Sequence, residues 1–414
     1  MKKALPALAL LIALLAPTRP AAADGDPTLD VAVGDPARKG RLAPLVLDGI
    51  TDTRTSELIS PATLVKRLEG TSLLFLGEEH TSILSHEVQL RVLKELIHSG
   101  RKVLLGLEMF PVAEQRFLDD WGAGRYTEEA FVEQAHWYTN WGYNWNYYRE
   151  IFLFARDHKV PIYAINVPQE AVAVVARKGF DGLTDEEAAK LPKKIDFASA
   201  DHRKLFGSYF DEMDMIHGQL SEERKDSMFQ AQCTWDAVMG HNAVDTLKKH
   251  GAPGAIMVVL VGRGHVAFDL GAARQAAIGY DGKIASVIPL PVFADKHERT
   301  KVRASYAGFI WGTAREGESP YPLLGITISG VKDKPGLTVV AIQRKSVAEA
   351  CGLCVGDELS TFDGANIPDR ETLAQHMSNK RWGDEVRLAV KRGGAEKTIV
   401  CDFRRTPDEP AKTP

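Results

Sequence analysis

The stretch Ser72-Leu-Leu-Phe-Leu-Gly-Glu-Glu-His80 decides the class of fold, because a short apolar run passes directly into charged residues. Similar apolar runs occur at residues 103–107, 160–165 and 256–261. Each of the four runs predicts a fully buried strand. An apolar-periodic helix is expected over residues 85–99, between the first two runs, and this order predicts a parallel-sheet α/β domain with helical insertions.

Polar residues follow all four predicted strands. They are Glu78, Glu79, His80, Glu108, Asn166, Arg263 and His265. In an open parallel sheet, ligands bind beyond the carboxyl ends of the strands. We therefore expect these side chains to surround one crevice, with Asn166 and Arg263 among the ligand-binding residues.

The histidines and carboxylates of this set support two kinds of chemistry. His80, His265 and Glu108 could bind a divalent metal such as Zn, Mn or Fe and leave a position for water. With Glu78, they could equally act as general acids and bases without a metal. For any one of these residues, the competing interpretation is a helix cap or a hydrogen-bonded polar group of the core.

Two further polar pairs are expected near the crevice. His86 and Gln89 lie three residues apart at the start of the predicted helix, so they share one face and could contact the ligand. Gln232 and Asp236 lie one turn apart on a segment with the apolar spacing of a core helix.

Residues 137–148 are far richer in aromatic side chains than the chain as a whole, of which 8% is aromatic. Such a surface could stack a flat ligand such as a tetrapyrrole, with a tyrosine or a nearby histidine as axial ligand of its iron. The candidate tyrosines are Tyr138, Tyr143, Tyr147 and Tyr148. Alternatively, these rings pack a helical insertion onto the sheet.

The N-terminal residues have the layout of a cleavable secretory signal, with two lysines, an apolar stretch and a small-residue run. Residues 1–23 are expected to be this signal and 24–44 a flexible leader, which predicts an exported protein, soluble in the periplasm or secreted. The net charge of -4 gives no excess of positive charge for binding nucleic acid. A homodimer is left open.

A cluster of Glu, Gly, Ser and Pro near residue 318 separates two domains, expected at 45–314 and 320–404. The second contains short β-like runs and predicts a small barrel, followed by a disordered tail at 405–414. Cys351 and Cys354 have the spacing of a redox motif, but no thioredoxin-like pattern surrounds them. Packing or one local disulfide is the favoured interpretation.

The first domain resembles the haem-binding-uptake family of ChaN-like proteins, in the Tiki superfamily, over residues 45–291. The resemblance rests on Gly77-Glu-Glu-His80 with His86 and Gln89, Leu107-Glu-Met-Phe110, Ala164-Ile-Asn-Val-Pro168, Ala231-Gln-x-x-Trp-Asp236 and Gly262-Arg-Gly-His265. It implies a haem-binding role in iron acquisition and a pocket formed by Glu78, His80, Glu108 and His265. Other branches of the superfamily are hydrolases.

The second domain resembles PDZ domains of the bacterial protease-associated kind, over residues 321–403. The matching motifs lie at residues 346–357, 362–364 and 390–394. The resemblance implies that Leu323, Leu324, Gly325 and Ile326 form the loop that receives a peptide C-terminus.

These features lead to three hypotheses. The favoured one is an exported protein that binds haem or a related iron ligand and uses its PDZ domain to bind the C-terminal or extended peptide of a partner. The second is a metal-dependent hydrolase, peptidase or esterase-like, whose PDZ domain recruits substrates. The third is a scaffold with an inactive pocket.

Overall fold

The computed structural model describes residues 27–167, 169–210, 221–292, 300–317, 319–330 and 336–404. The expected signal and tail lie outside these residues. The described chain forms two compact units. One contains residues 27–131 and 146–317, and the other contains residues 132–145 and 319–404.

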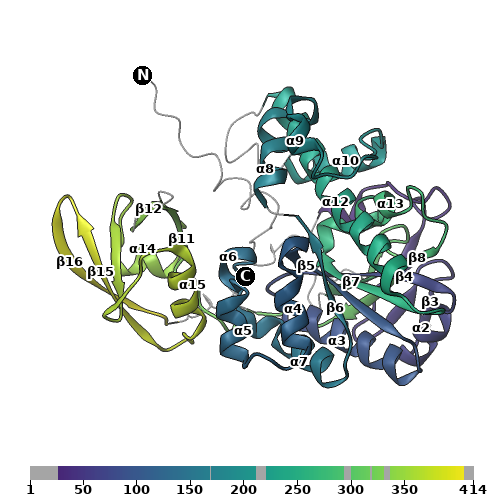
Figure 1. Ribbon diagram of the computed structural model, residues 1–414, viewed down its shortest axis with the longest axis horizontal. Coiled ribbons are helices and arrows are strands. Elements are labelled where there is room, and N and C mark those ends of the chain that lie inside the picture. The colour runs from purple at the N-terminus through teal and green to yellow at the C-terminus, as the bar shows by residue number, and fades with distance from the viewer. Residues whose placement is uncertain are drawn as a thin grey trace, which may run out of the picture. The chain divides into compact units, whose positions relative to one another are not determined.

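The larger unit contains a mixed, mostly parallel eight-stranded sheet with the order β3-β2-β10-β8-β4-β7-β5-β6 (Figure 1). Its strands are β2 (Ile50–Asp52), β3 (Glu57–Ile59), β4 (Thr71–Glu78), β5 (Val103–Pro111), β6 (Ile162–Asn166), β7 (Ile256–Gly262), β8 (Lys283–Pro291) and β10 (Phe309–Thr313). From β10 to β6 in that order, neighbouring strands run parallel, whereas β2 runs antiparallel to both of its neighbours, β10 and β3. The prediction of a parallel-sheet α/β domain is confirmed.

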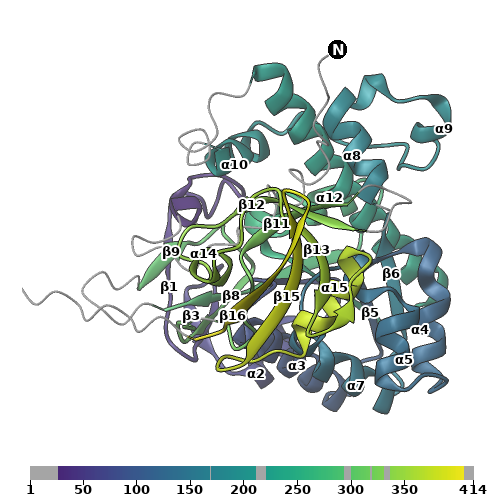
Figure 2. The same cartoon turned by 90° about the vertical axis from the view of Figure 1, so that its left-hand side faces the viewer.

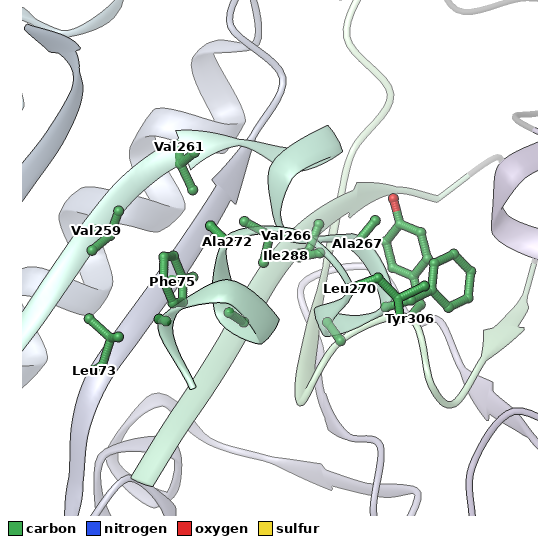
Figure 3. Close-up of a cluster of buried hydrophobic side chains, with 14 of the residues drawn as sticks. Leu73, Phe75, Val259, Val261, Val266, Ala267, Leu270, Ala272, Ile288 and Tyr306 are labelled. Carbon is green, nitrogen blue, oxygen red and sulfur yellow. The ribbon is translucent and has the colours of Figure 1, made fainter. Parts of the chain in front are cut away.

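Helices cover both faces of this sheet because its central strands are apolar on both sides. All seven residues of β7 are buried. On one face, Leu73, Phe75 and Val259 join the core cluster shown in Figure 3, together with residues of α12 (Glu222–His250) and α13 (Ala272–Ala276). The opposite face is covered by α2 (Pro61–Arg67), α3 (Ile83–His98) and α7 (Arg149–Asp157).

Long helical insertions follow β5 and β6. The other helices that the structure describes in these insertions are α4 (Gln115–Gly122), α5 (Glu128–Gln134), α6 (Trp137–Asn140), α8 (Gln169–Lys178), α9 (Asp185–Ala188) and α10 (Ala200–Phe210), of which α6 belongs to the smaller unit. A small two-stranded sheet pairs β1 (Leu42–Pro44) with β9 (Lys301–Arg303). The segment expected to be a leader does bury apolar side chains, because Leu29 and Val33 belong to the main core cluster.

Gln115 covers the edge of the sheet at β6. Its side-chain nitrogen donates to the carbonyl of Ile162 at 2.8 Å, and its side-chain oxygen accepts from the amide of Ala164 at 2.8 Å. The side-chain amide thus takes the place that a neighbouring strand would fill.

The smaller unit is built on an antiparallel sheet with the order β11-β12-β13-β15-β16, and β14 pairs with β13 (Figure 2). Its strands are β11 (Ile326–Gly330), β12 (Leu337–Ile342), β13 (Glu358–Phe362), β14 (Ala365–Asn366), β15 (Glu385–Arg392) and β16 (Ala395–Asp402). Helices α14 (Val347–Cys351) and α15 (Arg370–Ser378) complete it. This arrangement confirms the predicted small β domain.

Two of the three cysteines of this unit form a disulfide. Cys351 at the end of α14 is bonded to Cys401 of β16, 50 residues away, while Cys354 is exposed and free. The spacing of Cys351 and Cys354 therefore does not mark a mutual disulfide. Across the described residues, no helix is both long and apolar enough to cross a membrane.

Candidate functional site

The carboxyl ends of β4, β7 and β5 are neighbours in the sheet, and they bring the predicted strand-end residues together. Glu78 ends β4, Glu108 lies near the end of β5, and His265 follows β7 in a short 3-10 turn. All three side chains are buried. These three polar groups of the expected crevice thus lie inside the protein.

Glu78 is the centre of the first half of this network. One carboxylate oxygen accepts a hydrogen bond from the Tyr148 hydroxyl at 2.6 Å and lies 2.9 Å from His80 Nδ1. The other oxygen accepts from Gln89 Nε2 at 2.7 Å and lies 3.6 Å from His86 Nδ1. His86 and Gln89, which share a helix face as expected, both contact this carboxylate.

These partners keep Glu78 ionised although it is buried. Burial alone would raise the pKa of its carboxyl, but the interaction with His86 and the hydrogen bonds with His80 and Tyr148 outweigh burial and lower the pKa to about 2. Burial would in turn lower the pKa of His80, yet its contacts with Glu78 and the nearby charge of Glu108 raise it. The pair favours a carboxylate next to a protonated imidazole.

Gly262 allows His80 to approach Glu108. A Cβ atom at position 262 would lie 2.8 Å from His80 Cε1 and 3.6 Å from Glu108 Oε2, so a side chain there would collide with the imidazole. The Gly262 amide donates to the same Glu108 oxygen at 2.6 Å. The first glycine of the Gly262-Arg-Gly-His265 motif is therefore explained by close packing, while no atom crowds Gly264.

His265 forms the second half of the network. Its Nε2 lies 3.4 Å from Glu108 Oε1, and its Nδ1 lies 2.6 Å from Asp236 Oδ1. Burial would lower the pKa of His265, but the charge of Glu108 and the hydrogen bond to Asp236 raise it. Gln232 Nε2 donates to the same Asp236 oxygen at 3.4 Å. Gln232 and Asp236 thus reach the strand ends, as their helical spacing suggested.

These contacts form two groups of carboxylates and imidazoles, Glu78 with His80, and Glu108 with His265 and Asp236. The charge of Glu108 also acts on His80, so each histidine lies near two acids, an arrangement that can hold or transfer a proton. Among the residues that the structure describes, no group of three or more His, Cys, Asp or Glu side chains is arranged to hold a metal ion. The described positions of His80, Glu108 and His265 thus do not form the metal-binding group predicted from the sequence.

The other two predicted ligand-binding residues of the strand ends have identifiable neighbours. Asn166 donates to the Glu108 carbonyl at 2.7 Å and accepts from Trp235 Nε1 at 2.8 Å, so it stabilises the end of β5. Arg263 lies 3.3 Å from Glu79 and is partly exposed. The side chain of Asn166 is thus used in hydrogen bonds within the protein, whereas that of Arg263 is partly exposed to solvent.

The four candidate tyrosines differ in exposure. Tyr138, Tyr147 and Tyr148 are buried, and the Tyr148 hydroxyl is bonded to Glu78. Tyr143 is half-buried, with its ring 5.3 Å from that of Trp141. The aromatic segment therefore divides into one tyrosine at the Glu78 network, two other buried rings and one ring that reaches the surface.

His202 of α10 was not anticipated as part of this region. Its Nε2 lies 3.7 Å from Asp236 Oδ2, an oxygen that has no hydrogen-bond partner among the described residues. Its Nδ1 lies 3.2 Å from the Arg274 guanidinium. Burial and the Arg274 and His265 charges lower the pKa of His202 to about 4, although Asp236 opposes them. No motif or spacing in the sequence marks this residue.

The loop predicted to receive a peptide C-terminus lies directly before β11, the edge strand of the smaller unit. Leu323 is 67% exposed, whereas Leu324 is buried in the core of this unit. Gly325 has a φ of +75°, and a Cβ there would lie 2.3 Å from Ser346 Cβ. Ile326 begins β11. Burial of Leu324 and the backbone conformation of Gly325 thus fix the shape of the loop. Another residue at position 325 would be strained.

His202 should make the larger unit sensitive to acid. The folded protein keeps this side chain neutral down to pH about 4, whereas the unfolded chain binds a proton near the usual pKa of 6.5, so stability is lost as pH falls through this window. Between pH 7.5 and pH 5, we expect wild type to lose about 2 kcal/mol more of its unfolding free energy than His202→Asn does.

Urea unfolding at the two pH values measures this difference. His98→Asn is the matched control, because His98 is exposed at the end of α3. Equal losses in wild type and His202→Asn would contradict the assignment.

Comparisons with known proteins place both units. Residues 64–275 match the family model described as haem-binding uptake, Tiki superfamily, ChaN, and residues 322–402 match the PDZ domain. The chain is 24% identical over 285 residues to the protein RETICULATA-RELATED 5, chloroplastic, of Arabidopsis thaliana. That match covers 60% of this chain and 35% of the relative, so the chain spans about a third of the length of this curated protein.

Two solved structures are similar to parts of the chain. ChaN of Campylobacter jejuni, whose structure is described as showing cofacial heme binding, is 18% identical with a TM-score of 0.49, over 64% of this chain and 98% of that chain. The PDZ domain of EpsC from Vibrio cholerae is 28% identical with a TM-score of 0.17, over 19% of this chain and 95% of that chain. Because the first family model spans about half of the chain, this protein belongs to the haem-binding uptake family of ChaN-like proteins in the Tiki superfamily, here joined to a PDZ domain.

Proposed function

We propose that this chain is an exported binding protein that holds haem or a related iron ligand for uptake and uses its PDZ domain to bind the peptide tail of a partner. The family match of residues 64–275 carries the proposal. The bond between Cys351 and Cys401 supports export, because disulfides persist mainly in oxidising compartments. In this proposal, residues 1–23 are the signal, 45–314 hold the ligand and 320–404 bind the peptide.

Flat aromatic rings and a donor for the iron both favour haem binding, and the aromatic segment contains both. When bound, haem supplies an iron that accepts an axial ligand such as a tyrosine oxygen. Of the four candidate tyrosines, Tyr143 fits best because it is half-buried and lies beside the half-buried ring of Trp141. The buried Tyr148 hydroxyl already donates to Glu78. Tyr143 would therefore hold the iron, and Trp141 would contact the macrocycle.

Replacing Tyr143 tests this assignment. We expect Tyr143→Phe to weaken haem binding by about tenfold or more, a loss of about 1.4 kcal/mol, and to change the visible spectrum. Tyr147→Phe, which alters a buried ring of the same segment, is the control and should bind as wild type does. Titration of the full chain with haem, followed by absorbance, measures both; wild-type affinity in Tyr143→Phe would reject this tyrosine as the ligand.

The peptide-binding role is supported by the backbone of the loop before β11. Its carbonyls are used inside the domain, since the amide of Ala348 donates to Leu324 and that of Gln343 to Gly325, both at 2.9 Å. Among the described hydrogen bonds, none has the N–H of Leu324 or Gly325 as donor. These amides are suited to a peptide carboxylate, while β11 has a sheet edge to which the peptide could add as a strand.

Gly325→Ala should abolish detectable peptide binding, because the new Cβ would push the loop away from Ser346. Gly364→Ala is the matched control. Gly364 also has a positive φ, of +82°, but no atom lies within 4 Å of the place that a Cβ would take there, so that variant shares the backbone strain without the collision. Binding of a peptide selected from a C-terminal library is measured by calorimetry, and equal affinities in the two variants would remove this loop from the binding site.

A hydrolase of the Tiki superfamily is the second candidate, and the contact between His265 and Asp236 favours it. An imidazole held by a carboxylate can take a proton from water. The second oxygen of Asp236, which has no hydrogen-bond partner among the described residues, leaves the polar network incomplete on that side. Zn, Mn or Fe would have to be bound after His80 and Glu108 had separated from their present partners.

Joint replacement of His80 and His265 by alanine separates the two candidates. A binding protein that uses Tyr143 should keep its haem affinity, because neither histidine belongs to the aromatic segment. A metal-dependent hydrolase should instead lose its metal and its turnover together. Elemental analysis, haem titration and a hydrolysis assay on the purified full chain give the three readouts.

A further inference from the structure

Residues 132–145, hereafter the link segment, are flanked on both sides by residues anchored in the larger unit. Before it, Phe131 is fully buried, with its ring 4.8 Å from that of Trp121 and 5.5 Å from that of Phe152. After it, Tyr148 donates to Glu78 at 2.6 Å, and its ring lies 4.3 Å from His86. The residues that flank the link segment are therefore held within the larger unit, on the second side by the polar network.

The middle of the link segment is attached to α15 of the PDZ domain, with which it forms one compact unit. Near the start of α15, Glu371 accepts a hydrogen bond from Thr139 at 2.7 Å and lies 3.4 Å from His136. At the end of α15, the Ser378 carbonyl accepts from Asn144 at 3.1 Å. The segment thus contacts both ends of this helix.

Internal contacts make the link segment stiff. The rings of Trp137 and Trp145 pack edge to face at 4.9 Å, and Trp137 Nε1 donates to the Tyr143 carbonyl at 2.7 Å. His136 has a φ of +46°, which is unusual for a residue other than glycine and shows that its surroundings fix the backbone there. A stiff element transmits a displacement of α15 instead of absorbing it.

The position of α15 also depends on the loop that would receive the peptide. Leu373 of α15 and Leu324 of that loop belong to the same buried cluster, so a peptide that changes the loop also changes the packing of the helix. Displacement of α15 would act on Thr139 and Asn144 through the contacts with Glu371 and Ser378.

We propose that the link segment couples peptide binding at the PDZ domain to the Glu78 network of the α/β domain. The proposal rests on the peptide-binding function proposed above. A peptide that moves α15 changes the contact between Tyr148 and Glu78, and a change at that contact alters peptide affinity by the same free energy. The PDZ domain then acts as a sensor of the α/β site as well as a tether.

Tyr148→Phe tests the coupling, because it removes only the hydroxyl bonded to Glu78. We expect it to change peptide affinity by about fivefold and to speed amide hydrogen exchange over residues 370–378 of the full chain. Tyr280→Phe is the matched control, since it removes a 2.6 Å hydrogen bond between Tyr280 and Ser72 in the same unit. The control should leave both readouts unchanged.

Thr139→Val removes the hydrogen bond to Glu371, at the other end of the proposed coupling. Because Thr139 is exposed, the substitution should not disturb the fold. It should speed exchange over residues 146–150, and in its background Tyr148→Phe should no longer alter α15. If Tyr148→Phe and Tyr280→Phe give the same exchange over residues 370–378, the coupling is overturned. Failure of every peptide to bind would reject the peptide-binding function instead, while the exchange data would still decide the coupling.

Discussion

The buried charge of Glu78 is the constraint on which the α/β site depends. A carboxylate inside a protein is tolerated only when hydrogen bonds and opposite charges replace its water. Here the replacement comes from the neighbouring His80, from His86 and Gln89 on α3, and from Tyr148 after the link segment. One side chain thus determines how a strand, a helix and a distant insertion must meet.

The other buried acids at the strand ends are also held by hydrogen bonds and neighbouring imidazoles. Glu108 is held by the Gly262 amide and lies beside His265, which in turn contacts Asp236 of α12. Because β4, β7 and β5 are neighbours, the acids and imidazoles lie at a spacing that the sheet sets. The network is therefore a property of the strand order and not of any single motif.

Much of this arrangement could be predicted from local sequence. Apolar runs that lead into Glu78, Glu108, Asn166 and His265 predicted buried parallel strands. Because ligands bind beyond the carboxyl ends of such strands, these residues were also predicted to lie close together. The contacts made by Tyr148 and His202 could not be predicted, because each lies on an insertion whose path is set by tertiary packing. The exposure of Tyr143 and the hydrogen bond from Thr139 to Glu371 likewise depend on tertiary packing, which the spacing of apolar residues in the sequence does not indicate.

Gln115 has a consequence for how the protein behaves at high concentration. An uncovered edge strand invites pairing with another chain, which leads to aggregation. By bonding to the Ile162 carbonyl and the Ala164 amide, the Gln115 side chain occupies one acceptor and one donor that a second copy would need at β6. A single polar side chain thereby makes this edge of the larger unit less able to pair with another chain.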